Sequence, residues 1–68
     1  MLSDDKILKK FANRVKQLRI EKGDTQIDAY NETGIHFGRI EQGKRDVSLT
    51  TIVKIADYFQ ISVGELVD

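Results

Sequence analysis

Arg39-Ile40-Glu41-Gln42-Gly43-Lys44-Arg45 is the most informative segment of this 68-residue chain. In it, an apolar residue and a carboxylate precede a glycine, which typically ends a helix, and two cations follow. Thr25 lies upstream and Ser48 downstream, and each is suited to cap the start of a helix. The pattern predicts a surface where helix ends and cations meet, which favours binding to the phosphate groups of a nucleic acid.

The N-terminal third of the chain predicts two helices. Apolar residues recur at helical spacing over residues 3–22, where Ser3 or Asp4 can act as the N-cap and Gly23 as the stop. Thr25 and Asp28 form a capping-box pattern at the start of a short second helix. The expected apolar side of this second helix consists of Ile27, Ala29 and Tyr30.

The remainder predicts three further helices. One ends at Gly43, a second is capped by Ser48, and a third opens with the capping-box pair Ser62 and Glu65. The pattern contains no alternating strand, so we expect an all-α, five-helix fold. The residues expected to face the core in the last part of the chain are Phe37, Ile40, Leu49, Ile52, Ile55, Ala56 and Phe59.

Composition restricts the class of protein. Sixty-eight residues correspond to a single domain over 1–68, and the lack of cysteine excludes disulfides and thiolate metal sites. No apolar run approaches the roughly 20 residues that span a bilayer, and no signal-peptide pattern is present, so we expect a cytoplasmic protein. His36 is the only histidine and has no neighbouring nucleophile or second ligand. We therefore expect no catalytic residue, no metal and no cofactor.

The charge distribution is more informative than the net charge. The formal net charge is zero, which argues against a strongly basic nucleic-acid domain. Between Lys6 and Lys22, however, seven cations accompany one acid, Glu21. This asymmetry allows one basic face on a neutral protein. Lys6, Lys9 and Lys10 could form a phosphate-seeking arm or a solvated helix face, and we favour the solvated face.

Six segments together resemble the lambda repressor/Cro-like (Xre-type) helix-turn-helix family. In chain order they are Val15–Arg19, Lys22–Gln26, Arg39–Arg45, Ser48–Leu49, Lys54–Asp57 and Ile61–Leu66. The resemblance implies a compact five-helix lambda repressor-like domain that binds duplex DNA as a homodimer, with its third helix in the major groove. It implies no small-molecule ligand, and residues 1–10 extend the first helix beyond the matching part.

The helix-turn-helix itself is shortened. Between Gln26 and Ile40 the family has nearly one helical turn more than this chain, roughly three residues. In one alignment the second helix has its usual length, Gly34-Ile35 is the turn, and the recognition helix is short. In the other alignment the second helix is cut short and Asn31 is the turn.

We favour the second alignment on packing grounds. It gives a recognition helix that Thr33 caps and that runs to Gln42. The family buries two apolar residues three apart late in this helix, and Phe37 and Ile40 fill those positions only in this alignment.

The resemblance also assigns roles to individual residues. Gln26, Lys44 and Arg45 are expected to contact phosphates, Arg39 to read guanine, and His36, Ile35 and Thr33 to contact bases, the latter two through thymine methyl groups. Arg19 and Glu41 are expected to form a partly buried ion pair. The expected dimer interface is Ile61, Val63, Leu66 and Val67.

These features together predict a DNA-binding transcriptional regulator, either a small repressor or a controller protein. The alternative is a helical protein-interaction module that keeps the fold and has lost sequence-specific DNA reading. The zero net charge, the shortened helix-turn-helix and the glycines Gly34 and Gly38 on the reading face motivate that alternative.

Overall fold

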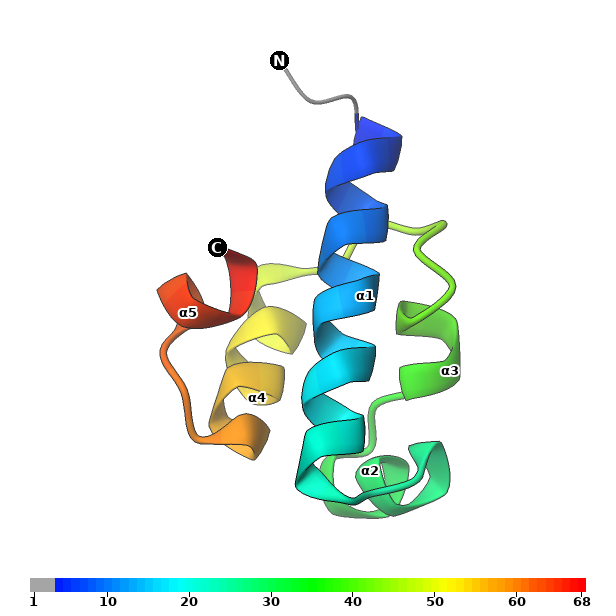
Figure 1. The fold of residues 1–68 in the computed structure, drawn as a ribbon, viewed down its shortest axis with the longest axis vertical. Coiled ribbons are helices and arrows are strands. Elements are labelled where there is room, and N and C mark those ends of the chain that lie inside the picture. The colour runs from blue at the N-terminus through cyan, green and yellow to red at the C-terminus, as the bar shows by residue number, and fades with distance from the viewer. Residues whose placement is uncertain (1–3) are drawn as a thin grey trace.

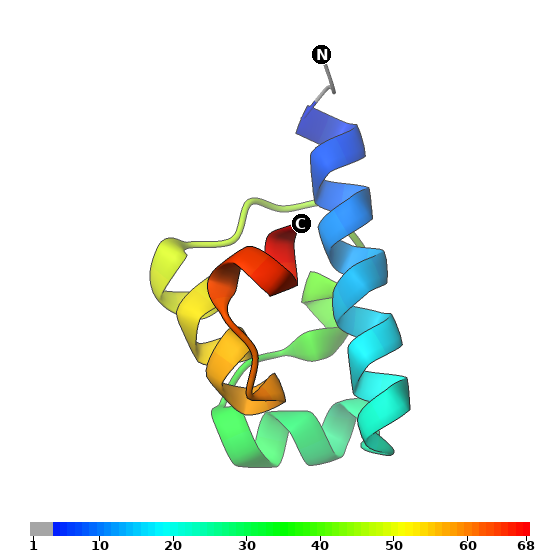
Figure 2. The same ribbon diagram turned by 60° about the vertical axis from the view of Figure 1, so that its left-hand side comes forward.

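The computed structural model describes residues 4–68 and contains, in that range, five helices and no strand. These are α1 (Asp4–Lys22), α2 (Gln26–Thr33), α3 (Phe37–Ile40), α4 (Leu49–Phe59) and α5 (Val63–Val67). The expected all-α, five-helix class is confirmed. The expected alternative N-cap Ser3 lies outside the described residues. The longest helix, α1, has α4 and α5 on one side and α3 on the other, while α2 lies across its C-terminal end (Figures 1 and 2).

Side-chain caps begin α2, α4 and α5 where the sequence places them. The Thr25 hydroxyl accepts a hydrogen bond from the Asp28 N–H at 3.1 Å, and the Asp28 carboxylate accepts one from the Thr25 N–H at 3.0 Å. Ser62 and Glu65 form the same reciprocal pair at α5, and Ser48 caps α4. These bonds satisfy backbone donors that have no partner inside the helix. The backbone hydrogen bond from Thr25 also lowers the pKa of Asp28.

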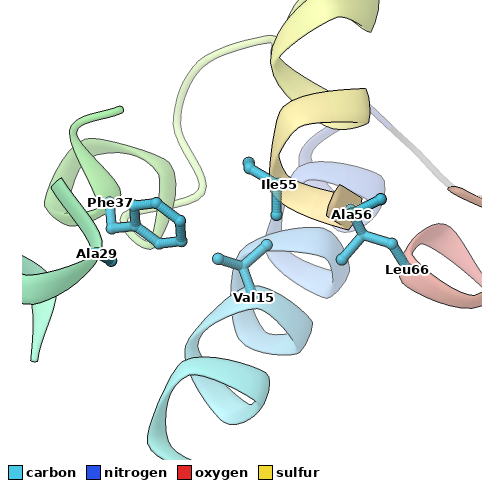
Figure 3. Close-up of a cluster of buried hydrophobic side chains, with 6 residues drawn as sticks. All are labelled: Val15, Ala29, Phe37, Ile55, Ala56 and Leu66. Atoms are coloured by element: carbon cyan, nitrogen blue, oxygen red, sulfur yellow. The ribbon is translucent and has the colours of Figure 1, made fainter. Parts of the chain in front are cut away.

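The core gathers one or two residues from each helix. Phe37 of α3 is 1% exposed and lies beside Ala29 of α2, facing Val15 of α1 (Figure 3). Its ring meets the edges of Tyr58 and Phe59 with centroid separations of 5.5 and 6.3 Å. The buried apolar cluster consists of Val15, Ala29, Phe37, Ile55, Ala56 and Leu66.

Three residues that helical spacing assigns to the core are exposed instead. Ile27, Tyr30 and Leu49 have exposed fractions of 71%, 43% and 71%. In α2 the reason is geometric: Ala29 is the buried position, and Ile27 lies two residues away, about 200° around the helix. Ile27 therefore points away from the core, and the predicted apolar side of the second helix is wrong in this respect.

The favoured alignment of the helix-turn-helix is also wrong. α2 continues through Thr33, and Gly34 ends it with φ 75°, a left-handed conformation that glycine adopts without strain. Thr33 does not cap α3, because its hydroxyl donates to the Ala29 carbonyl at 2.7 Å and accepts from the Ile35 N–H at 3.0 Å. The shortening falls in the recognition helix. The favoured alignment requires a long recognition helix to bring Phe37 to the core. In the structure Phe37 is buried as the first residue of α3.

An ion pair holds α3 against the end of α1. The Arg19 Nε and Nη2 atoms donate to the two Glu41 carboxylate oxygens at 2.7 and 2.9 Å, and Nη1 donates to the Asp24 carbonyl at 2.9 Å. The two side chains are 10% and 4% exposed, so the predicted partly buried pair is confirmed. The side-chain hydrogen bond between Arg19 and Glu41 raises the pKa of Arg19 above the ordinary arginine value.

Two further contacts secure the same region. The Tyr58 hydroxyl of α4 donates to the Asp24 carboxylate, and burial together with this bond raises the Tyr58 pKa. Just after the C-terminal end of α3, Gly43 has φ 67° and lies so close to α1 that a Cβ there would be 3.2 Å from the Ala12 Cβ. Both a left-handed backbone and close packing therefore require glycine at this position.

We expect Arg19→Met to lower the free energy of unfolding by about 3–5 kcal/mol, because it leaves the Glu41 carboxylate buried without its partner. Urea denaturation measures the change. Lys22→Met is the matched control, because Lys22 makes an exposed ion pair with Asp24 at 3.6 Å and its loss should cost about 1 kcal/mol or less.

The double variant Arg19→Met/Glu41→Leu should be less destabilised than the sum of the two single variants, because no buried charge is left alone. A cost for Arg19→Met no larger than that for Lys22→Met would contradict the structural role of the pair.

The Asp28 cap predicts a pH dependence. A pKa lowered in the folded state contributes stability above the unfolded-state pKa of about 4, and this stability is lost as the pH falls through the folded-state pKa. The stability advantage of the wild type over Asp28→Asn should therefore be largest above about pH 5 and shrink toward about pH 2. Thermal melts of both proteins across this range measure it, and a difference independent of pH argues against the charged cap.

Candidate nucleic-acid interface

A shallow hollow of about 700 Å³ lies between α2 and α3, with one residue of α1 at its edge. We call it the α2–α3 hollow. The residues that line it are Lys16, Gln26, Ile27, Tyr30, His36, Phe37, Gly38, Arg39, Glu41 and Gln42. Three residues predicted to contact DNA thus lie at one hollow. Gln26 comes from α2, and His36 and Arg39 come from the N-cap position and the body of α3.

Gln26 is the first residue of α2 and is held in place by α3. Its Nε2 donates to Glu41 Oε1 at 3.2 Å, and its amide lies against Gly38, where a Cβ would be 3.2 Å from Gln26 Oε1. Glu41 is in turn held by Arg19. The side chain is exposed, and the amide has a second N–H that a phosphate oxygen can accept.

His36 and Arg39 are both exposed at the hollow. His36 occupies the N-cap position of α3 but makes no side-chain cap bond; its ring instead lies against Tyr30, with centroids 4.7 Å apart and an interplanar angle of 30°. Arg39 is the only one of the four α3 residues that is exposed. Phe37 is buried, Ile40 packs against the core, and Gly38 lies under Gln26.

The charges at the hollow favour an anion. Lys16 and Arg39 are the two cations that line it, and Glu41 is the one carboxylate. The Glu41 charge is neutralised by Arg19, so the local balance is positive although the whole chain is neutral. Lys16 was not among the predicted site residues; the signal for it was the run of cations in the first helix, which does not by itself say which lysine faces α3.

Two predicted base contacts are elsewhere. Thr33 is half-buried, with its hydroxyl occupied, and faces a different depression lined also by Glu32, Lys54, Asp57 and Tyr58. Ile35 is half-buried and packs against the core. Both assignments followed from the wrong alignment, in which these residues belonged to the recognition helix, and the structure does not support either as a base contact.

Lys44 and Arg45 form a second group of cations. They are exposed in the connection between α3 and α4, directly after Gly43, which packs on α1 at Lys9 and Ala12. This connection runs along the N-terminal half of α1, away from α2 (Figure 1). Neither residue lines the α2–α3 hollow. The cations therefore lie over two places on the molecule.

The predicted dimer residues are only partly available to a partner. Leu66 is fully buried in the core, so its assignment to an interface is corrected, and Ile61 and Val63 are half-buried against the same core. Val67 is 48% exposed and borders a groove of about 540 Å³ between α1 and the C-terminal end of the chain. The apolar residues lining this groove are Ile7, Leu8, Phe11, Val47, Ile52, Leu66 and Val67.

Features of two other classes of site are absent from residues 4–68. No helix among them is long and apolar enough to cross a membrane. They also contain no group of three or more histidine or carboxylate side chains placed to hold a metal ion.

Comparison with known proteins agrees with this geometry. A family model described as helix-turn-helix matches residues 15–66. The control protein C.MunI of Mycoplasma sp. is 35% identical over 69 residues, an alignment that covers 96% of this chain and 90% of that protein. The matched range includes α2, α3 and every predicted DNA contact. The chain belongs to the Xre-type helix-turn-helix family of DNA-binding transcriptional regulators.

Proposed function

We propose that this protein binds operator DNA through the α2–α3 hollow and acts as a small repressor or control protein. The observation that carries the proposal is that Gln26, His36 and Arg39, separated in sequence, line one exposed hollow together with Lys16. Phosphate contacts by Lys16 and Gln26 would position α3, and Arg39 would reach a base edge in the major groove. The relative C.MunI, named a control protein, supports a regulatory role.

Lys44 and Arg45 extend the proposed contact surface. They follow α3 directly and carry two positive charges with no hydrogen-bonded acid of their own among the interactions described for residues 4–68. Cations placed on both sides of α3 would engage the phosphate backbone on both sides of the groove that α3 enters.

The same proposal includes a homodimer that pairs through the groove beside Val67. Exposed apolar side chains, Ile7 at 50% and Val67 at 48%, border this groove. Its lining also carries two cations, Lys10 and Arg14, and two acids, Asp46 and Asp68. A surface with equal numbers of both charges is suited to self-pairing about a two-fold axis, in which each cation faces an acid of the other copy.

Fluorescence anisotropy on labelled duplex DNA tests the binding proposal. Affinity should fall steeply as salt rises, with a slope of about −0.9 in log K against log salt for each phosphate contact. Lys16→Ala and Lys44→Ala should each reduce that slope by about one, and Arg39→Ala should weaken binding to a preferred sequence by about 1–3 kcal/mol.

Lys54→Ala is the matched control, because Lys54 is exposed on α4 and faces the depression beside Glu32 and Asp57. It should leave both the affinity and the salt slope near the wild-type values. An absence of duplex binding at about 50 mM salt would overturn the proposal and favour an interaction module without DNA reading.

Sedimentation equilibrium tests the dimer. Val67→Asp should shift the protein toward the monomer mass, because it places an unpaired charge in an apolar interface. Ile20→Asp, an exposed apolar position at 57% that does not line the groove, should leave the mass unchanged. A wild-type protein that stays monomeric at high micromolar concentration and on DNA contradicts pairing through this groove.

A further inference from the structure

α3 is too short to supply a set of base-reading side chains by itself. Its four residues extend about 6 Å along the helix axis. Phe37 and Ile40 face the core and Gly38 has no side chain, so Arg39 is the one long side chain that α3 presents to solvent. Any further base contact must come from neighbours that line the same hollow.

α2 places two large exposed side chains at that hollow. Ile27 is 71% exposed and Tyr30 is 43% exposed, and both line the hollow beside Arg39. They lie three residues apart, on the same side of α2. The Tyr30 ring also lies against the His36 ring at 4.7 Å, which extends the apolar surface from α2 into the connection before α3. Exposed apolar side chains that adjoin one another and have polar neighbours are suited to contact an apolar group of a partner.

The acidic residues of α2 lie outside the lining of this hollow. Neither Asp28 nor Glu32 lines it, and Glu32 lines the separate depression near Lys54. The cations Lys16 and Arg39 line the same hollow as the apolar pair. A duplex bound there would meet both positive charge and apolar side chains.

We propose that Ile27 and Tyr30 of α2, with His36, form a composite base-reading surface that recognises the C5-methyl group of thymine in the major groove. The inference rests on the proposed DNA-binding function and assigns the reading of sequence largely to α2 rather than to α3. The reason for the thymine methyl is chemical: base edges in the major groove present donors, acceptors and this one apolar group, and an isoleucine can recognise only the last. The adjacent rings of Tyr30 and His36 line the same hollow as Ile27 and complete the apolar surface.

The test uses a labelled duplex enriched from a random-sequence pool, with an unrelated duplex as the non-specific reference. Each thymine of the enriched duplex is replaced in turn by deoxyuridine, which removes only the methyl group. Wild-type affinity should fall about fourfold at one or two positions, the effect of exposing one methyl-sized apolar group. Ile27→Ala should lose affinity for the thymine duplex by a similar factor and should no longer distinguish thymine from uracil at one of those positions.

Ile20→Ala is the matched control, because Ile20 is 57% exposed beside Ile27 in a neighbouring depression but does not line the α2–α3 hollow. It should retain the thymine preference. Tyr30→Ala should reduce the preference for the enriched over the unrelated duplex, and melting curves should show all three variants folded, since the truncated side chains are exposed.

The outcomes separate this inference from the proposed function. If the wild type binds no duplex at low salt, the proposed function fails. If it binds with a steep salt dependence but enriches no sequence, or if Ile27→Ala keeps the full thymine preference, DNA binding stands and the reading role of α2 is overturned. Equal losses for Ile20→Ala and Ile27→Ala also overturn it.

Discussion

The Arg19 guanidinium fixes the three parts of the chain that build the proposed interface. It binds Glu41 at the end of α3 and the Asp24 carbonyl in the turn before α2, and Glu41 in turn accepts a hydrogen bond from Gln26 at the start of α2. Burying two charges in a small domain gives little net stability, because desolvation offsets most of their attraction. The three directed hydrogen bonds of Arg19 restrict the position of α3 more narrowly than apolar packing alone does. This pair therefore sets where α3 lies relative to α2, and hence the shape of the hollow between them.

Local signals in the sequence predict the starts of α2, α4 and α5, whereas the start of α3 and the non-local arrangements are predicted only in part. Thr25 with Asp28, Ser48, and Ser62 with Glu65 all cap helices as expected, because capping depends on residues within one turn. The Arg19–Glu41 pair joins residues 22 positions apart, and periodicity says nothing about such a pairing. It was predicted through the resemblance to a family, which carries tertiary information that a single sequence does not state.

The errors in the expected reading face have one origin, the way apolar residues of α2 and α3 are assigned to the core. The favoured alignment buries Phe37 late in a long recognition helix, and that alignment places Thr33 and Ile35 on the reading face. In the structure the glycine turn at Gly34 delivers Phe37 directly to the core, so α2 keeps its length and α3 loses a turn. Ile27 and Tyr30 then have no core position left, because Ala29 alone fills the inward side of α2. Their exposure follows from tertiary placement, which helical spacing cannot predict.

A neutral chain can bind a polyanion when its acids are engaged elsewhere, and this structure arranges its charges in that way. Glu41 is neutralised by Arg19, and Asp28 and Glu32 of α2 do not line the hollow. What remains at the proposed interface is positive, but the surface is small and α3 contributes one exposed side chain. Few contacts per copy give a modest affinity, since each phosphate contact adds only a small increment at physiological salt. A second copy on a two-fold site would double the contact set and the length of sequence that is read, so the short recognition helix is a physical argument in favour of the proposed dimer.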